Sequence, residues 1–246
     1  MVEKLKRRLS DKNVRIIVLV AATVIIFFYY KAFFTVGVHF NDTFLKKEVV
    51  SEETHYKGKS KYGSIEIIVK GKGDDEKKSM TEVSYYLPNN INKSFSVYHN
   101  YKDQWLLGSV EIKDEGGNTL FDGRYRRGSL FLYDSNNEPL IQGSFGFYND
   151  TPKVTYDSSY EVPLKSVVEF SLFEKEGIRG NVEIMIYAVI LIILTAIDIK
   201  SPLMFFTLSH AIHVKDPEPT DLYIAMQQVS WVVIPAIALI LLTVAI

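Results

Sequence analysis

The segment IIVLVAATVIIFFYYKAFFTVGVHF, residues 16–40, is an almost unbroken run of apolar residues near the start of the chain. About 20 apolar residues are enough for a helix to cross a bilayer. Basic residues outnumber acidic ones in the stretch before it; the bases are Lys4, Lys6, Arg7, Arg8, Lys12 and Arg15. Because basic residues that flank a span stay in the cytoplasm, we expect residues 1–15 inside and residues 16–40 as a transmembrane helix.

A cleaved signal peptide is the alternative for this segment, since it also combines a basic stretch with an apolar one. The run is long for a signal peptide, and bulky Phe and Tyr residues stand where a cleavage site requires small ones. We therefore favour an uncleaved anchor. Lys31, Tyr29 and Tyr30 suit the outer interface of the membrane, where aromatic and long basic side chains reach the headgroups.

Two further apolar segments lie near the end of the chain, at residues 182–199 and 222–246. A buried hairpin of a soluble protein is the alternative, but beside the first segment we interpret both as transmembrane helices. Three spans place residues 41–181 outside the cytoplasm, residues 200–221 inside and the C-terminus outside. The sequence thus predicts a multi-pass protein of the cell membrane, with an α+β fold.

The composition excludes several classes of function. The 28 Lys and Arg residues balance 29 Asp and Glu residues, whereas a nucleic-acid-binding domain normally carries a basic excess. The chain has no cysteine, which excludes disulfides, thiolate catalysis and Cys-ligated metal sites. No set of residues at catalytic or metal-ligating spacing is visible, so we expect a protein that is not an enzyme, without a cofactor and without a bound metal.

The middle region reads as short strands separated by turns, without a helical period. The strands are predicted from β-branched and aromatic runs bounded by Gly, Asn, Asp and Pro. They lie at residues 64–71, 81–88, 93–100, 109–114, 129–134, 143–149 and 167–174. We predict a mostly antiparallel, all-β extracytoplasmic domain, either a sandwich or an open barrel.

One basic stretch of this domain is a candidate binding site. Arg124, Arg126 and Arg127 surround Tyr125, and such a cluster can bind an anion or an acidic cell-envelope polymer. The alternative is the solvated face of a hairpin. The domain is accordingly expected to be a binding, sensing or interaction module.

The predicted inner loop, residues 200–221, contains a short helix suited to the membrane interface. The stretch HVKDPEPTDLYIAMQQ, residues 213–228, joins this loop to the last predicted span. Pro219 ends any preceding helix, and Thr220 can cap the last one with Asp221 at its positive end. A partner or ligand site is the alternative role. The residues of this motif are Lys215, Asp216, Pro217, Glu218, Pro219, Thr220, Asp221 and Tyr223.

These residues resemble the pattern K-D-x-E-P-[ST]-D-x-Y of a bacterial membrane family known as domain of unknown function 6199. The resemblance covers about residues 184–246 and leaves the outer domain unrecognised. Because no activity is known for that family, the resemblance implies architecture and not function.

Our hypothesis is a non-enzymatic membrane protein that displays a β-rich binding or sensing domain. The alternative is an accessory subunit of a membrane transporter or of an envelope-synthesis complex. The expected partners are the lipid bilayer, a membrane protein or a second copy of the chain, and a cell-envelope polymer; no nucleic acid is expected.

Overall fold

A computed structural model describes residues 12–71, 79–100, 108–140, 156–157, 159–210 and 218–246. The chain folds as two compact units. One comprises residues 36–177, here called the β domain, and the other comprises residues 1–35 and 178–246, here called the helical unit. Each unit is considered by itself below.

The β domain is built on a meander in which each strand pairs with the next in an antiparallel manner. Its strands are β1 (Val36–Phe40), β2 (Thr43–Val50), β3 (Glu53–Ser60), β4 (Gly63–Lys70), β5 (Ser79–Leu87), β6 (Ile91–Asn100), β7 (Gly108–Lys113), β8 (Thr119–Tyr125), β9 (Leu132–Tyr133) and β10 (Pro139–Leu140). A short 3-10 helix, η1 (Pro88–Asn90), joins β5 to β6. The sheet order is linear from β10 to β1, with the two-residue β11 (Gly177–Ile178) beside β1.

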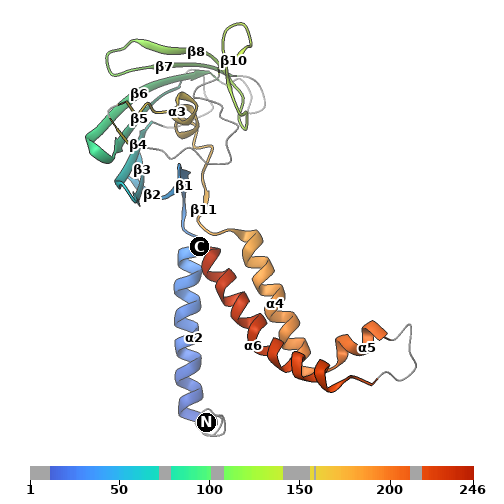
Figure 1. Ribbon diagram of the computed structural model, residues 1–246. Coiled ribbons are helices and arrows are strands. Elements are labelled where there is room, and N and C mark those ends of the chain that lie inside the picture. Colours follow the sequence, from blue (N-terminus) through green and yellow to red (C-terminus); the bar gives the residue numbers. More distant parts are fainter. Residues whose placement is uncertain (1–11, 72–78, 101–107, 141–155, 158, 211–217) are drawn as a thin grey trace. The chain divides into compact units, whose positions relative to one another are not determined.

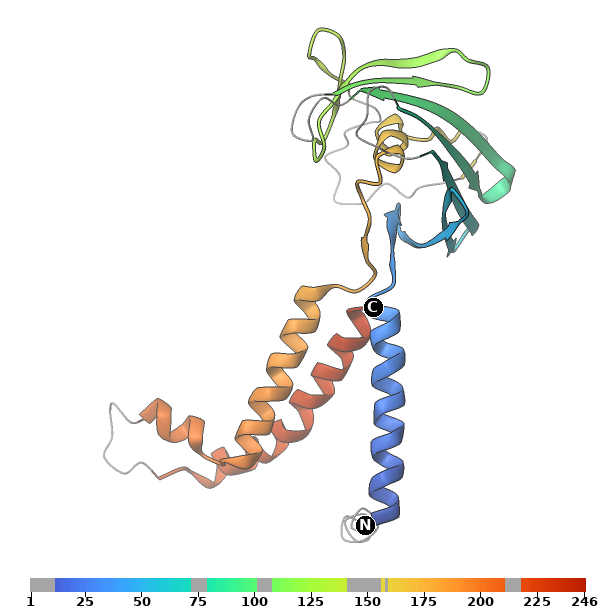
Figure 2. The same ribbon diagram turned by 180° about the vertical axis from the view of Figure 1, so that it is seen from behind.

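Figures 1 and 2 show that this sheet bends around one helix, α3 (Leu164–Ser171). The side chains that face α3 alternate along each strand, as in Ile65, Ile67 and Val69 of β4. The strand register places Ile67 opposite Tyr85 and Val83 opposite Phe95, so the buried face of the sheet is mainly apolar. Because every second side chain of a strand points to the same face of the sheet, these alternating apolar residues together form the core.

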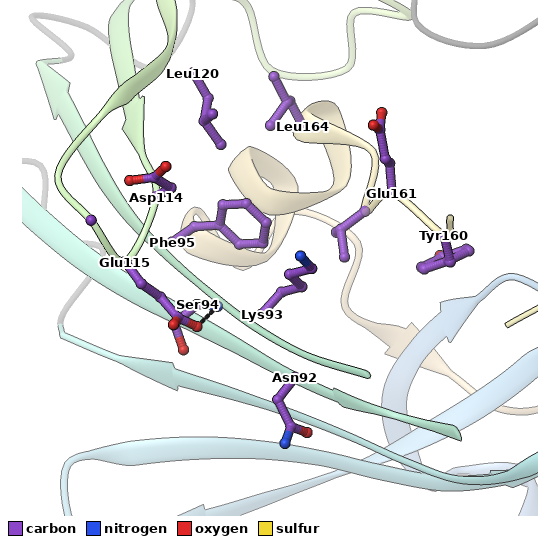
Figure 3. A pocket seen from close by; sticks show the side chains of 12 residues that line it. Asn92, Lys93, Ser94, Phe95, Asp114, Glu115, Leu120, Tyr160, Glu161 and Leu164 are labelled. Carbon is purple, nitrogen blue, oxygen red and sulfur yellow. Dashed lines mark hydrogen bonds between the residues drawn. The ribbon is translucent and has the colours of Figure 1, made fainter. Parts of the chain in front are cut away.

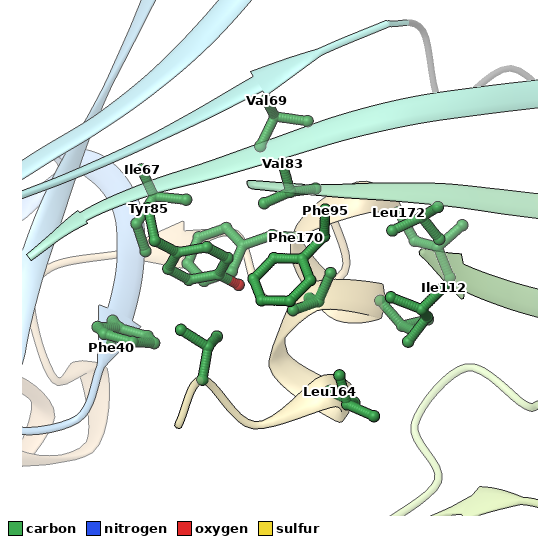
Figure 4. Packing of buried hydrophobic residues seen from close by; sticks show 14 of the residues in the cluster. Phe40, Ile67, Val69, Val83, Tyr85, Phe95, Ile112, Leu164, Phe170 and Leu172 are labelled. Carbon is green, nitrogen blue, oxygen red and sulfur yellow. The ribbon is translucent and has the colours of Figure 1, made fainter. Parts of the chain in front are cut away.

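Helix α3 supplies the opposite side of that core, which Figure 4 shows. Its buried Leu164, Val167 and Val168 lie three and four residues apart, on one helical face. The ring of Phe170 meets the rings of Tyr56 and Tyr85 edge to face, with centroids 5.2 and 5.9 Å apart. Edge-to-face contacts of this kind add specificity to apolar burial.

Three expectations for the β domain are corrected by this arrangement. Residues 167–174 do not form a strand, because Leu164 to Ser171 follow a helical period that their β-branched composition conceals. The sandwich is wrong, because the described strands belong to a single sheet. Of residues 129–134, only Leu132 and Tyr133 are in a strand. Strands β2 and β3 were not predicted, and the strand expected at 143–149 lies outside the described residues.

The helical unit contains α2 (Lys12–Phe33), α4 (Val182–Lys200), α5 (Met204–His210) and α6 (Asp221–Val244). The first apolar segment was expected to be helical to Phe40, but the helix ends at Phe33. Residues 36–40 form β1, in which buried Val38 and Phe40 lie on either side of exposed His39. The apolar run thus hides a change of period from helix to strand.

Hydrogen bonds fix the ends of these helices against one another. Asn181 donates its backbone N–H to the carbonyl of Ala245 at 2.8 Å, which makes α4 and α6 antiparallel neighbours. Gly180 donates to the carbonyl of Phe33 at 2.9 Å. A Cβ at position 180 would lie 2.2 Å from the Phe33 ring, so only glycine fits there.

Two helices of this unit, α4 and α6, are long and apolar enough to cross a membrane. The described apolar part of α2, residues 19–33, is shorter. The length and composition of these helices are weak evidence of membrane association. The number of spans and their orientation remain predictions.

Candidate binding sites

The β domain contains a cavity of about 560 Å³ beside the start of α3. Three segments form it: residues 92–95 of β6, the turn between β7 and β8, and the chain that leads into α3. Figure 3 shows Phe95, Leu120 and Leu164 on its apolar side and charged side chains on its rim. A volume of this size is typical of small-ligand sites.

Hydrogen bonds hold two of the rim carboxylates in place. Glu115 Oε1, in the turn after β7, accepts from the backbone N–H of Ser94 in β6 at 2.9 Å. Asp114 accepts from the backbone N–H of Asn118 at 2.8 Å and from its side-chain amide at 3.0 Å. The side-chain bond from Asn118, followed by its backbone bond, holds the pKa of Asp114 below its ordinary value. Asp114 is therefore ionised at neutral pH.

The charge of the cavity is negative. Asp114, Glu115 and Glu161 contribute three carboxylates to the lining, and Lys93 contributes one ammonium group. Such a rim favours ligands that donate hydrogen bonds or carry positive charge, and it repels anions.

A group of tyrosines lies next to this cavity. Tyr160 lines the cavity, and its ring lies 5.0 Å from that of Tyr156, which in turn lies 5.8 Å from that of Tyr62. The side-chain amide of Asn41 donates to the Tyr156 hydroxyl at 2.9 Å. Burial raises the pKa of Tyr156 and of Tyr160, so both hydroxyls stay protonated and available as donors.

The predicted anion site, Arg124, Arg126 and Arg127, lies at the end of β8 and in the turn that follows, away from the cavity lining. The Arg124 guanidinium donates to Asn137 Oδ1 at 3.2 Å. Glu174, which follows α3, accepts from the backbone N–H of Gly128 in the same turn and from the Tyr125 hydroxyl. The Glu174 carboxylate thus already accepts hydrogen bonds from two donors that could otherwise bind an anion.

The inner-loop motif is only partly described. Lys215, Asp216 and Pro217 lie outside the described residues, whereas Glu218 is exposed and precedes α6. Thr220 Oγ1 accepts from the backbone N–H of Tyr223 at 3.2 Å, with Asp221 in the first turn. The predicted N-cap is confirmed. Tyr223 packs on Phe206 of α5, with ring centroids 4.9 Å apart.

A second candidate site, a groove of about 380 Å³, lies between α4 and α6. Its polar centre is Asp198, which accepts from Gln227 Nε2 at 2.8 Å and from Trp231 Nε1 at 2.6 Å. The lining consists of Leu194, Thr195, Asp198, Phe205, Tyr223, Met226, Gln227, Ser230, Trp231 and Ile234. Of these, only Tyr223 was a predicted site residue.

Two features of the sequence point to this groove. Asp198 and Glu183 are the two acidic residues of a strongly apolar segment, and such residues are rare in spans without a functional or structural partner. Gln227 and Trp231 are four residues apart on α6, so both point to the same side. Only the pairing of α4 with α6 reveals that they converge on one carboxylate.

These features define an α+β chain in which an antiparallel β domain accompanies a pair of long apolar helices. A family model described as "Family of unknown function (DUF6199)" matches residues 187–245. The match confirms the resemblance of the C-terminal region, and it covers Asp198, Gln227 and Trp231. No curated protein and no solved structure was found to match the chain.

Proposed function

We propose that this chain is a multi-pass membrane protein that displays its β domain outside the cytoplasm, where the domain binds or senses a ligand. The observation that carries the proposal is the cavity of about 560 Å³ beside α3. It lies in a unit with its own extensive core, so its walls are supported by packing and not by the ligand.

The chemistry of the rim indicates the class of ligand. Three carboxylates and the Tyr160 side chain face a space that also presents the apolar ring of Phe95. Amines and hydroxyls would be bound by the carboxylates, and a sugar ring or an aliphatic chain would cover the apolar side. The amino sugars and amines of a cell-envelope polymer combine both properties.

The helical unit supports the membrane part of the proposal. Large apolar side chains of α2, α4 and α6 are exposed, among them Ile25, Ile193, Leu222 and Val232. A soluble monomer rarely exposes apolar surface of this extent. In a bilayer the same side chains would contact lipid tails.

The topology can be tested by labelling with a membrane-impermeant maleimide, because the chain has no cysteine of its own. Ser109→Cys places a thiol at an exposed position of the β domain, and Glu218→Cys places one in the predicted inner loop. We expect labelling of intact cells at position 109 only. Labelling at position 218 only would contradict the orientation.

Ligand binding can be tested by calorimetry on the full-length protein in mild detergent, with soluble glucosamine oligomers, which carry free amines, as the probe. Leu120→Trp should fill the cavity, because Leu120 lines it. The matched control is Leu130→Trp, at a position that is 78% exposed and outside the lining. We expect binding to the wild type and to the control, and none to Leu120→Trp. Equal binding by both variants would contradict the cavity as the site.

The second candidate is an accessory subunit of a membrane transporter or of an envelope-synthesis complex. It is favoured by the exposed apolar faces that α4 and α6 retain after packing on each other. The test is purification from native membranes in mild detergent. Stoichiometric co-elution with one such enzyme or transporter supports this role, and elution as a pure single species contradicts it.

A further inference from the structure

We propose that the groove between α4 and α6 binds the primary ammonium group of an aminophospholipid headgroup, with Asp198 as its counter-ion. The inference rests on the proposed membrane position of the helical unit. It assigns a ligand to a different site from the cavity of the β domain.

The first argument is the unbalanced charge of Asp198. Its two oxygens accept hydrogen bonds from the neutral donors Gln227 Nε2 and Trp231 Nε1. Within the part of the chain that the structure describes, no basic side chain forms an ion pair with it. A carboxylate near hydrocarbon is costly unless a cation compensates it, and a ligand ammonium would do so.

The second argument is accessibility. Gln227 is buried, whereas Asp198 is only half-buried and lines the groove. The two protein donors therefore orient the carboxylate without enclosing it. An ionised carboxylate has about four acceptor sites, so two donors leave capacity for the N–H groups of an ammonium ion.

The third argument is the aromatic lining. Phe205, Tyr223 and Trp231 all contribute to the groove. Aromatic faces attract ammonium groups, and Trp attracts them most strongly. Together with the carboxylate, they form the combination that recognises organic cations and disfavours phosphate or other anions.

The fourth argument is the gradient of polarity along the helices. Asp198 lies in the last turn of α4 and Tyr223 in the first turn of α6, so the polar end of the groove lies at the helix ends. Leu194 lies about one turn from Asp198 and Ile234 about three turns from Tyr223, so both lie further into the apolar segments. A headgroup at Asp198 would therefore leave its acyl chains beside Leu194 and Ile234, as a lipid at the interface requires.

The test is native mass spectrometry of the delipidated full-length protein in mild detergent. The probes are phosphatidylethanolamine, phosphatidylcholine and phosphatidylglycerol with identical acyl chains, and free ethanolamine. We expect phosphatidylethanolamine to bind about tenfold more tightly than phosphatidylglycerol. Equal affinity for the three lipids would overturn the proposal. Free ethanolamine that binds as tightly as phosphatidylethanolamine would overturn the lipid as the source of the ammonium group.

Two matched variants assign the effect to the carboxylate. Asp198→Asn should weaken phosphatidylethanolamine binding about tenfold, because it removes the charge while the Gln227 amide can rotate to pair with the new one. Glu183→Gln removes a carboxylate from an exposed position in the first turn of α4, outside the groove, and should leave binding unchanged. Unchanged binding by Asp198→Asn, with its lipid-free melting temperature preserved, would overturn the proposal.

Flotation with lipid vesicles separates this inference from the proposed function. A protein that floats with vesicles but shows no preference for phosphatidylethanolamine contradicts only the headgroup site. A protein that floats with no vesicle of any composition contradicts the membrane position itself.

Discussion

The two units of this chain differ in the solvent exposure of their large apolar side chains. In the β domain, Tyr56, Tyr85 and Tyr125 are completely buried, and the sheet closes over α3. In the helical unit, most of the large apolar side chains of α4 and α6 are exposed. The β domain is therefore stabilised by its own core, whereas the exposed apolar side chains of the helical unit fit the bilayer that we propose for it.

The largest expected effect concerns the core of the β domain. Leu45→Ala should lower the free energy of unfolding by about 2–5 kcal/mol, because Leu45 is 0% exposed and its loss leaves a cavity. The measurement is denaturant unfolding of the full-length protein in detergent, followed by tyrosine fluorescence. Leu130→Ala is the control, with an expected change within about 0.5 kcal/mol because Leu130 is 78% exposed. Equal effects would mean that the core is not where the structure places it.

The second prediction compares the effect of a lysine substitution at one exposed apolar position in each unit. Ile193→Lys on α4 and Val49→Lys on β2 both place a charge at an exposed position, with exposed fractions of 51% and 65%. In a bilayer the α4 variant should cost about 2.5–3.5 kcal/mol of insertion free energy, and the β2 variant should cost almost nothing. The measurement is the fraction of protein that resists carbonate extraction from membranes. If Ile193→Lys remains fully integrated and stable, α4 does not face lipid.

The third prediction concerns the start of α6. Thr220→Ala should destabilise the helical unit by about 1 kcal/mol, because the backbone N–H of Tyr223 loses its acceptor. Thr220→Ser keeps the hydroxyl and should retain most of the stability. Melting curves in detergent compare the three proteins. A loss in Thr220→Ser as large as in Thr220→Ala would show that the motif acts through something other than capping.

The sequence predicted some of these features because they depend on neighbouring residues. The alternation in β4 and the N-cap at Thr220 are local, and both are present. The helix at Leu164–Ser171 was misread because Val167, Val168 and Phe170 favour strands, while burial against the sheet decides the helix. The convergence of Asp198, Gln227 and Trp231 could not be predicted, because it depends on the register of two helices that are distant in sequence.

The smallest expected effect concerns the rim of the cavity and its pH dependence. Hydrogen bonds from Asn118 lower the pKa of Asp114 from its ordinary value of 3.8. A lowered pKa in the folded state stabilises the fold above pH 3.8, and this contribution is lost as the pH falls through the lowered value. Asp114→Asn should therefore melt below the wild type at neutral pH and approach it in strong acid. The control is Asp134→Asn, in the hairpin turn between β9 and β10 and outside the cavity. Binding of glucosamine oligomers should weaken in Asp114→Asn and persist in Asp134→Asn, because Asp114, unlike Asp134, contributes a carboxylate to the rim.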